Sequence, residues 1–114
     1  MVIEACSKNA VIVDLPPLPQ ATDELRAVTE VVYETGGCDL IIDFSRVEII
    51  TSACISSLLV LHTMLIQSGR RLVLCSVCAP VRRIFELTGL DEVFRFAQDD
   101  SAALKELRPP RGEG

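Results

Sequence analysis

Two cysteines three residues apart, Cys75 and Cys78, form the one conventional chemical motif of the sequence. They follow a predicted strand and precede a predicted helix, where the helix dipole stabilises a thiolate. Two thiolates supply half of a tetrahedral zinc site, but Cys6, Cys38 and Cys54 show no second paired spacing. Thiols without chemistry are therefore the simpler interpretation, and a thiol redox protein using Cys75 and Cys78 is an alternative.

The sequence offers little else for catalysis. Its single histidine, His62, lies in the most apolar predicted helix, and there is no G-x-S-x-G nucleophile elbow. Neither a G-x-x-x-x-G-K-S/T loop nor a G-x-G-x-x-G loop is present to hold a phosphate. We therefore predict a protein that is not an enzyme, with a structural His62, no catalytic residues, no metal and no cofactor.

Charge and composition exclude some classes of binding partner. The 114 residues suit one domain, and 16 acidic against 11 basic residues give a net charge of −5. Because cations are needed to displace phosphate counterions, and aromatic residues make up only 4% of the chain, we expect no nucleic-acid binding. No segment reaches the roughly 18 uncharged apolar residues of a membrane span, and no secretory signal is visible. The odd count of five cysteines favours reduced thiols, hence a cytoplasmic protein away from membranes.

The first half of the chain predicts a hairpin and then a helix. Val2–Ala5 and Val11–Leu15 are β-branched runs separated by turn residues. Thr22 is a good N-cap for a helix over Asp23–Glu34, which Gly36-Gly37 ends.

The second half predicts a parallel sheet. Leu40–Ile42 and Leu72–Leu74 are apolar runs about thirty residues apart with a helix over Ala53–Gln67 between them, the spacing of a right-handed βαβ unit. A helix from Pro80, a short strand at residues 93–96 and a helix capped by Asp99 or Asp100 complete the order. We predict an α/β fold, β-β-α-β-α-β-α-β-α, with a single mixed sheet and about four helices.

Two arginine pairs mark the predicted surface. Arg70-Arg71 starts a strand after a turn, and Arg82-Arg83 opens a helix whose next turn carries Glu86. Solvated faces are the simpler interpretation, and contact with an acidic partner is the alternative.

The stretch from Leu40 to Leu59, LIIDFSRVEIITSACISSLL, resembles the signature of the STAS domain, the fold of bacterial anti-sigma-factor antagonists. That family shows an apolar strand, Asp-Leu-Ser or a variant, and a spacer with Val and Phe or Ile. Asp-Ser-Ser-Gly or Asp-Ser-Thr-Gly then opens a helix. Asp43-Phe44-Ser45 matches the first part and Val47-x-Ile49-Ile50 the spacer. The likeness runs from about Val2 to Leu107, which implies a STAS domain over residues 1–108 and a disordered tail over 109–114.

The resemblance implies partner switching. Unphosphorylated antagonists of this family bind an anti-sigma factor that is also a serine kinase, and so release a sigma factor. The kinase phosphorylates the second hydroxyl residue of the family motif. A phosphate at a helix N-terminus is tolerated by the free N–H groups, but its charge of about −1.5 to −2 weakens a protein contact.

This sequence departs from the motif at the modified position. Thr51 stands where the family has its acid, Ser52 at the first serine, Ala53 at the phosphoacceptor and Cys54 at the glycine. Because Ala53 has no hydroxyl, we expect no phosphorylation there. Ser52 or Thr51 is a candidate displaced acceptor, but a serine at position 52 that caps its own helix is the stronger interpretation.

The sequence therefore predicts a regulatory protein that binds an anti-sigma factor or serine kinase-like partner. The predicted surface is the loop after Leu40–Asp43 with the start of the following helix, centred on Thr51, Ser52, Ala53 and Cys54. We expect a monomer or a weak homodimer. A stressosome-like scaffold with the same fold is the alternative.

Overall fold

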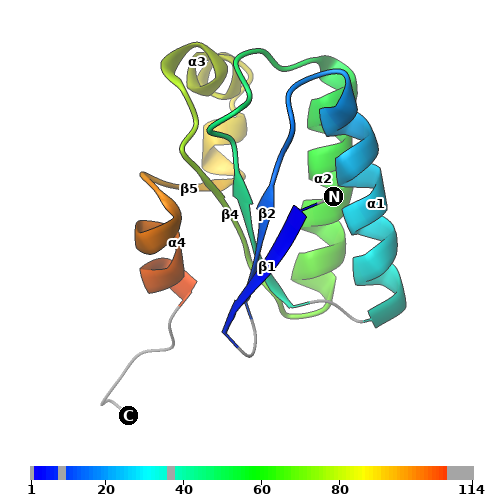
Figure 1. Cartoon of the computed structure of the whole chain (residues 1–114). Coiled ribbons are helices and arrows are strands. Elements are labelled where there is room, and N and C mark those ends of the chain that lie inside the picture. Colours follow the sequence, from blue (N-terminus) through cyan, green and yellow to red (C-terminus); the bar gives the residue numbers. More distant parts are fainter. Residues whose placement is uncertain (1, 8–9, 36–37, 108–114) are drawn as a thin grey trace.

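The computed structural model describes residues 2–7, 10–35 and 38–107 (Figure 1). One five-stranded sheet has the strand order β1-β2-β3-β4-β5. Its first pair is antiparallel and the other three pairs are parallel. The strands are β1 (Val2–Ser7), β2 (Ala10–Asp14), β3 (Asp39–Asp43), β4 (Leu72–Cys75) and β5 (Arg95–Ala97). The helices are α1 (Gln20–Thr35), α2 (Ser52–Gln67), α3 (Ala79–Leu87), the short 3-10 helix η1 (Leu90–Glu92) and α4 (Asp100–Leu107).

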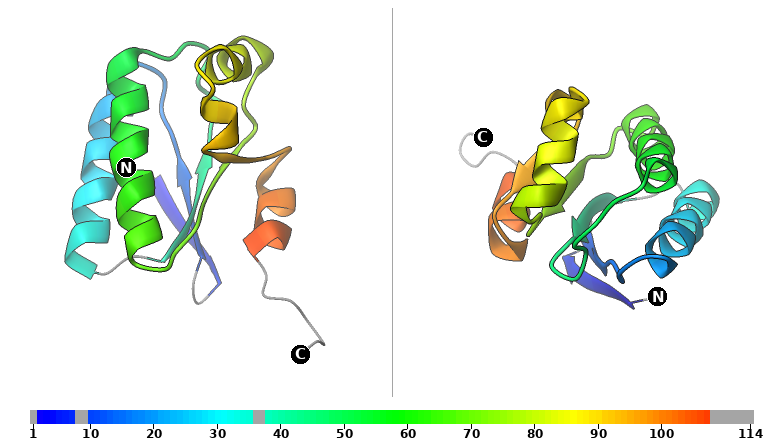
Figure 2. Two further views of the ribbon diagram at one scale, coloured as in Figure 1. Left: turned by 180° about the vertical axis from the view of Figure 1, so that it is seen from behind. Right: turned by 90° about the horizontal axis from the view of Figure 1, so that it is seen from above.

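The helices cover both faces of the sheet, and α4 lies on the face opposite α1 and α2 (Figure 2). Alternation along β3 explains the two cores, because successive strand residues point to opposite faces. Leu40 and Ile42 pack in the larger core with α1, α2 and α3, whereas Ile41 packs in the smaller core under α4. The continuous apolar run of β3 is thus the mark of a strand covered on both faces, as predicted.

The mixed sheet and the element order agree with the prediction, but the starts of α1 and of the last strand do not. The predicted cap at Thr22 is wrong, because α1 begins at Gln20 and the Ala21 N–H already donates to the Pro17 carbonyl at 3.3 Å. Ala21 is fully buried in the core. Because this residue packs there as part of the helix, α1 begins before Thr22.

The last strand also begins later than predicted. Gly89, with a φ of 77°, leads into η1, and β5 is confined to Arg95–Ala97. Phe94 is instead a buried core residue whose N–H donates to Leu90 O at 3.1 Å.

The predicted tail over 109–114 lies outside the described residues. Within the described part of the chain, every helix is too short or too polar to cross a membrane.

Candidate functional site

The loop between β3 and α2 is fixed to the core by three apolar side chains. Phe44, Val47 and Ile50 are all buried. The Phe44 N–H donates to the Cys75 carbonyl at the end of the neighbouring strand at 2.9 Å, and the Val47 N–H donates to Phe44 O at 2.9 Å. A loop anchored at these points presents the start of α2 in one conformation, which lowers the entropy cost of binding a partner.

Helix α2 begins with a threonine cap. Thr51 has extended backbone angles, and its hydroxyl oxygen accepts the Cys54 N–H at 3.2 Å. The prediction that the serine at position 52 is the cap is therefore wrong by one residue, since Ser52 is the first residue of the helix. In this hydrogen bond the Thr51 hydroxyl oxygen is the acceptor. The Ser52 side chain is exposed.

Three consecutive residues at this helix start reach the surface. Thr51, Ser52 and Ala53 are all exposed, and the first turn of α2 contains no acidic residue. The positive end of the helix dipole is thus not compensated by a carboxylate in its own first turn. An incoming acidic group would be stabilised at this position.

Cys54 does not belong to this surface. Its side chain is fully buried, and burial raises the pKa of the Cys54 thiol to about 11. The prediction that it contacts a partner is wrong, because Cys54 starts the buried stripe of α2. The buried residues of that stripe are Cys54, Leu58, Leu61 and Leu65.

One further exposed residue lies in the loop that the sequence prediction included without naming the residue. Ile49 precedes the helix cap and is 62% exposed, although its neighbour Ile50 is 7% exposed. No pattern in the spacer predicted this exposure, because a strand-like alternation that buries Val47 would bury Ile49 on the same face. We call Ile49, Thr51, Ser52 and Ala53 together the α2 docking surface.

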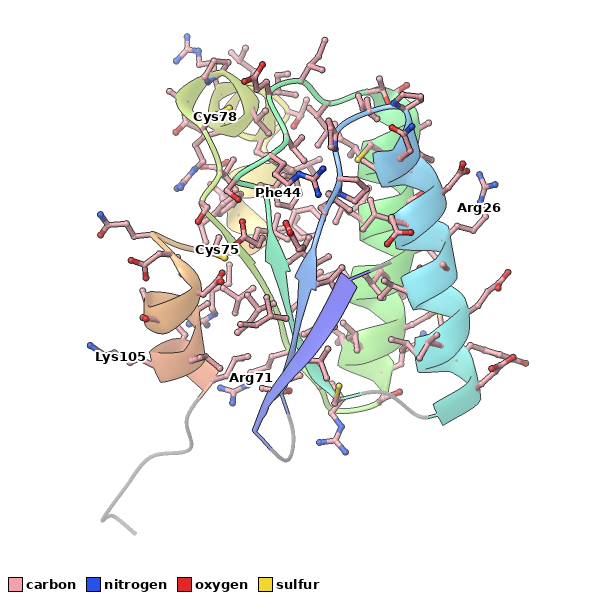
Figure 3. All side chains as sticks on the ribbon, in the orientation of Figure 1. Arg26, Phe44, Arg71, Cys75, Cys78 and Lys105 are labelled. Carbon is pink, nitrogen blue, oxygen red and sulfur yellow. The ribbon has the colours of Figure 1, made fainter. Side chains whose placement is uncertain are left out.

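The two cysteines of the C-x-x-C motif face different partners. The Cys75 thiol donates to Asp100 Oδ1 at 2.9 Å, whereas the Cys78 thiol donates to Val47 O at 3.6 Å. Figure 3 shows Cys75 near α4 and Cys78 at α3. Burial, followed by the hydrogen bond and charge of Asp100, raises the pKa of the Cys75 thiol well above its usual range. The geometry therefore disfavours a reactive thiolate at Cys75.

His62 has the environment of a structural residue. Its ring meets the Phe94 ring edge-on, with centroids 5.3 Å apart. Burial lowers the pKa of the imidazole, so the neutral form is favoured.

The two arginine pairs have different roles. Arg82 and Arg83 both pair with Glu86, at 3.9 and 4.0 Å, as the helical spacing predicts. Arg71 does more than mark the surface, because its guanidinium donates to the carbonyls of Glu106 and Leu107 at the end of α4. It also lies 3.5 Å from the Asp39 carboxylate.

Comparison with known proteins places the fold. The family model described as the STAS domain matches residues 4–103. A proposed anti-sigma factor antagonist from Thermotoga maritima is 22% identical, with a TM-score of 0.83 over 95% of this chain and 94% of that one. Unphosphorylated SpoIIAA, an anti-sigma factor antagonist, is 17% identical, with a TM-score of 0.75 over 96% and 98% of the two chains.

A third solved structure is a chain from the stressosome, described as a signal integration and transduction hub. It is 20% identical, with a TM-score of 0.73 over 93% of this chain and 95% of that one. At these identities the structural likeness shows the fold, and the family match over most of the chain shows the family. The chain belongs to the STAS domain family.

Proposed function

We propose that this protein is a bacterial, cytoplasmic regulator that binds an anti-sigma factor or serine kinase-like protein through the α2 docking surface. The observation that carries the proposal is the exposure of Thr51, Ser52 and Ala53 at the start of a rigidly anchored helix. Membership of the STAS family and the fold shared with SpoIIAA support a regulatory, non-enzymatic role.

The docking surface combines an apolar contact with an electrostatic one. Exposed Ile49 offers apolar area beside the first turn of α2, which has no acidic residue of its own. A partner that places an apolar side chain against Ile49 and a carboxylate at the helix start would satisfy both features.

The second part of the proposal is that phosphorylation at the usual family position does not switch this protein. Ala53 cannot accept a phosphate, and the Thr51 hydroxyl is engaged by the Cys54 N–H. Ser52 and Thr51 are both exposed and are the candidate displaced acceptors. If neither is phosphorylated, the protein binds its partner without control at this site.

A phosphorylation assay tests this second part. The purified protein is incubated with ATP and the anti-sigma-factor-type serine kinases of its own genome, and phosphate is mapped by mass spectrometry. We expect none within residues 51–57 of the wild type and restored modification in Ala53→Ser. Stoichiometric phosphate anywhere within residues 51–57 of the wild type would refute it.

Binding at the surface is tested with two matched isoleucines. Ile49→Ser removes the exposed apolar side chain beside the helix start, and Ile66→Ser removes one that is 55% exposed at the other end of α2. We expect the first variant to weaken binding of the purified partner about tenfold and the second to leave it unchanged. Equal losses in both variants would contradict the site.

A stressosome-like scaffold is the second candidate, favoured by the shared fold with the stressosome chain. Analytical ultracentrifugation separates the two functions. Our proposal requires a 12.5 kDa monomer or a weak dimer, and a large homo-oligomer would favour the scaffold.

A further inference from the structure

Three titratable side chains meet beneath the start of α4. Asp43 ends β3, Cys75 ends the neighbouring strand β4, and Asp100 is the first residue of α4. One carboxylate oxygen from each aspartate and the Cys75 sulfur lie within 4.8 Å of one another, and the Cys75 thiol donates to Asp100 Oδ1 at 2.9 Å. The parallel register that aligns Asp43 with Cys75 brings the first two together, and α4 returns across the sheet to add the third.

This cluster lacks a positive charge. Neither Asp43 nor Asp100 forms an ion pair among the described residues, whereas other acids nearby do. Asp14, which ends β2 beside Asp43, pairs with Arg46 at 4.0 Å. On the β5 side, Arg95 is held by Glu106 at 2.9 Å. The neighbouring cations are thus already committed to other carboxylates.

We propose that Asp43 and Asp100 share one proton, and that loss of this proton loosens the start of α4 from the sheet. Two carboxylates this close cannot both ionise without repulsion, so one proton between them is the stable arrangement. The bound proton lets one carboxyl donate to the other, while the Cys75 thiol donates to the remaining lone pairs of Asp100.

The electrostatics of Asp100 agree with this arrangement. Burial, a hydrogen bond to Asp43, and the charges of Asp43 and Asp99 raise the pKa of the Asp100 carboxyl, while the bond from Cys75 opposes them. A carboxyl whose pKa is raised by folding binds its proton more tightly in the folded state. Its stabilising effect is complete at low pH and is lost as the pH rises through the folded-state value.

Loss of the shared proton affects the two ends of α4 differently. The far end is held by the Arg71 guanidinium on the Glu106 and Leu107 carbonyls, contacts that do not involve the shared proton. The near end depends on the cluster. Loosening it uncovers the smaller core, in which Ala103 of α4 packs with Ile41 and Val73. Rising pH therefore exposes an apolar face of the sheet from one side.

Urea unfolding from about pH 4, near the pKa of an aspartate in an unfolded chain, up to pH 8 tests the proposal on the full chain. Asp100→Asn copies the protonated carboxyl, because its amide can donate to Asp43 and its carbonyl can accept from Cys75. We expect its urea midpoint to exceed that of the wild type at pH 8 and the gap to close as the pH falls through the raised folded-state pKa of Asp100. Glu92→Gln, which alters an exposed carboxylate on η1, should follow the wild type at every pH.

A second measurement keeps the test independent of folding defects. In carbon-detected NMR, the titration midpoint of Asp100 should fall in Asp43→Asn, because the charge and hydrogen bond of Asp43 both raise the pKa of Asp100. Amide exchange at the start of α4 should accelerate with pH in the wild type more than in Asp100→Asn.

Three results would overturn the proposal. The first is a midpoint gap between wild type and Asp100→Asn that stays constant with pH. The second is an Asp100 midpoint unchanged by Asp43→Asn. The third is a rise in the wild-type urea midpoint on adding Zn²⁺ at pH 8 that Asp100→Asn abolishes, because the cluster would then hold a metal ion in place of a proton.

Discussion

The hydroxyl oxygen of Thr51 lies 3.2 Å from the backbone nitrogen of Cys54 and accepts its N–H. This one contact fixes where α2 begins, and so which residues reach the surface. It exposes Ser52 and Ala53 and directs Cys54 into the core. The cap therefore has a structural role at the same position that the proposed function requires to be accessible.

Loss of the cap should destabilise the fold without removing any exposed apolar contact. Thr51→Val removes the acceptor for the Cys54 N–H while keeping the side-chain shape, and we expect a loss of about 1 kcal/mol in the free energy of unfolding. Thr51→Ser keeps an acceptor and should stay within a few tenths of a kcal/mol of the wild type. Urea denaturation measures both, and equal stability of Val and Ser variants would show that the cap contributes nothing.

Arg71 should matter more for stability than its neighbour in sequence. Arg71→Ala removes the donors to the last carbonyls of α4 and the pairing with Asp39, so we expect a loss of roughly 1–2 kcal/mol. Arg70→Ala is the matched control and should cost under about 0.5 kcal/mol, as at an ordinary surface position. Thermal unfolding compares the two, and a control as damaging as Arg71→Ala would contradict the role given to Arg71.

The buried thiols should react slowly in the native protein. With a pKa of about 11, the Cys54 thiol is only about one-thousandth ionised at pH 8, and burial suppresses the Cys75 thiolate further. We expect iodoacetamide at pH 8 to label half-buried Cys78 well before Cys54 and Cys75, and all three equally in urea. Mass spectrometry after timed quenching gives each rate. Fast labelling of native Cys75, or a reversible disulfide with Cys78, would revive the redox alternative.

The elements that depend on the periodicity or length of apolar runs were predicted from the sequence. Covered strands such as β3 follow from continuous apolar runs, and α2 from its length. It could not place the start of α1, because the burial of Ala21 sets that boundary and arises only when the helix packs on the sheet.

Part of the candidate site could not be predicted from the sequence either. The exposure of Ala53 follows from the helix, but the inward turn of Cys54 needed the cap at Thr51 rather than at the next residue. The link between Cys75 and Asp100 spans 25 residues and exists only because α4 crosses back over the sheet. Arg71 was predicted as a surface charge for the same reason, since its partners on α4 are distant in sequence.

Docking of the partner at the start of α2 is tested most directly by measuring the partner's affinity for variants of Ala53. Isothermal titration calorimetry would compare wild type, Ala53→Ser and Ala53→Asp against the purified anti-sigma-factor-type kinase without ATP. We expect the serine variant to bind within about threefold of the wild type and the aspartate variant to bind at least tenfold more weakly, because its charge is placed in the contact. An aspartate variant that binds as tightly as the wild type would contradict docking at the start of α2.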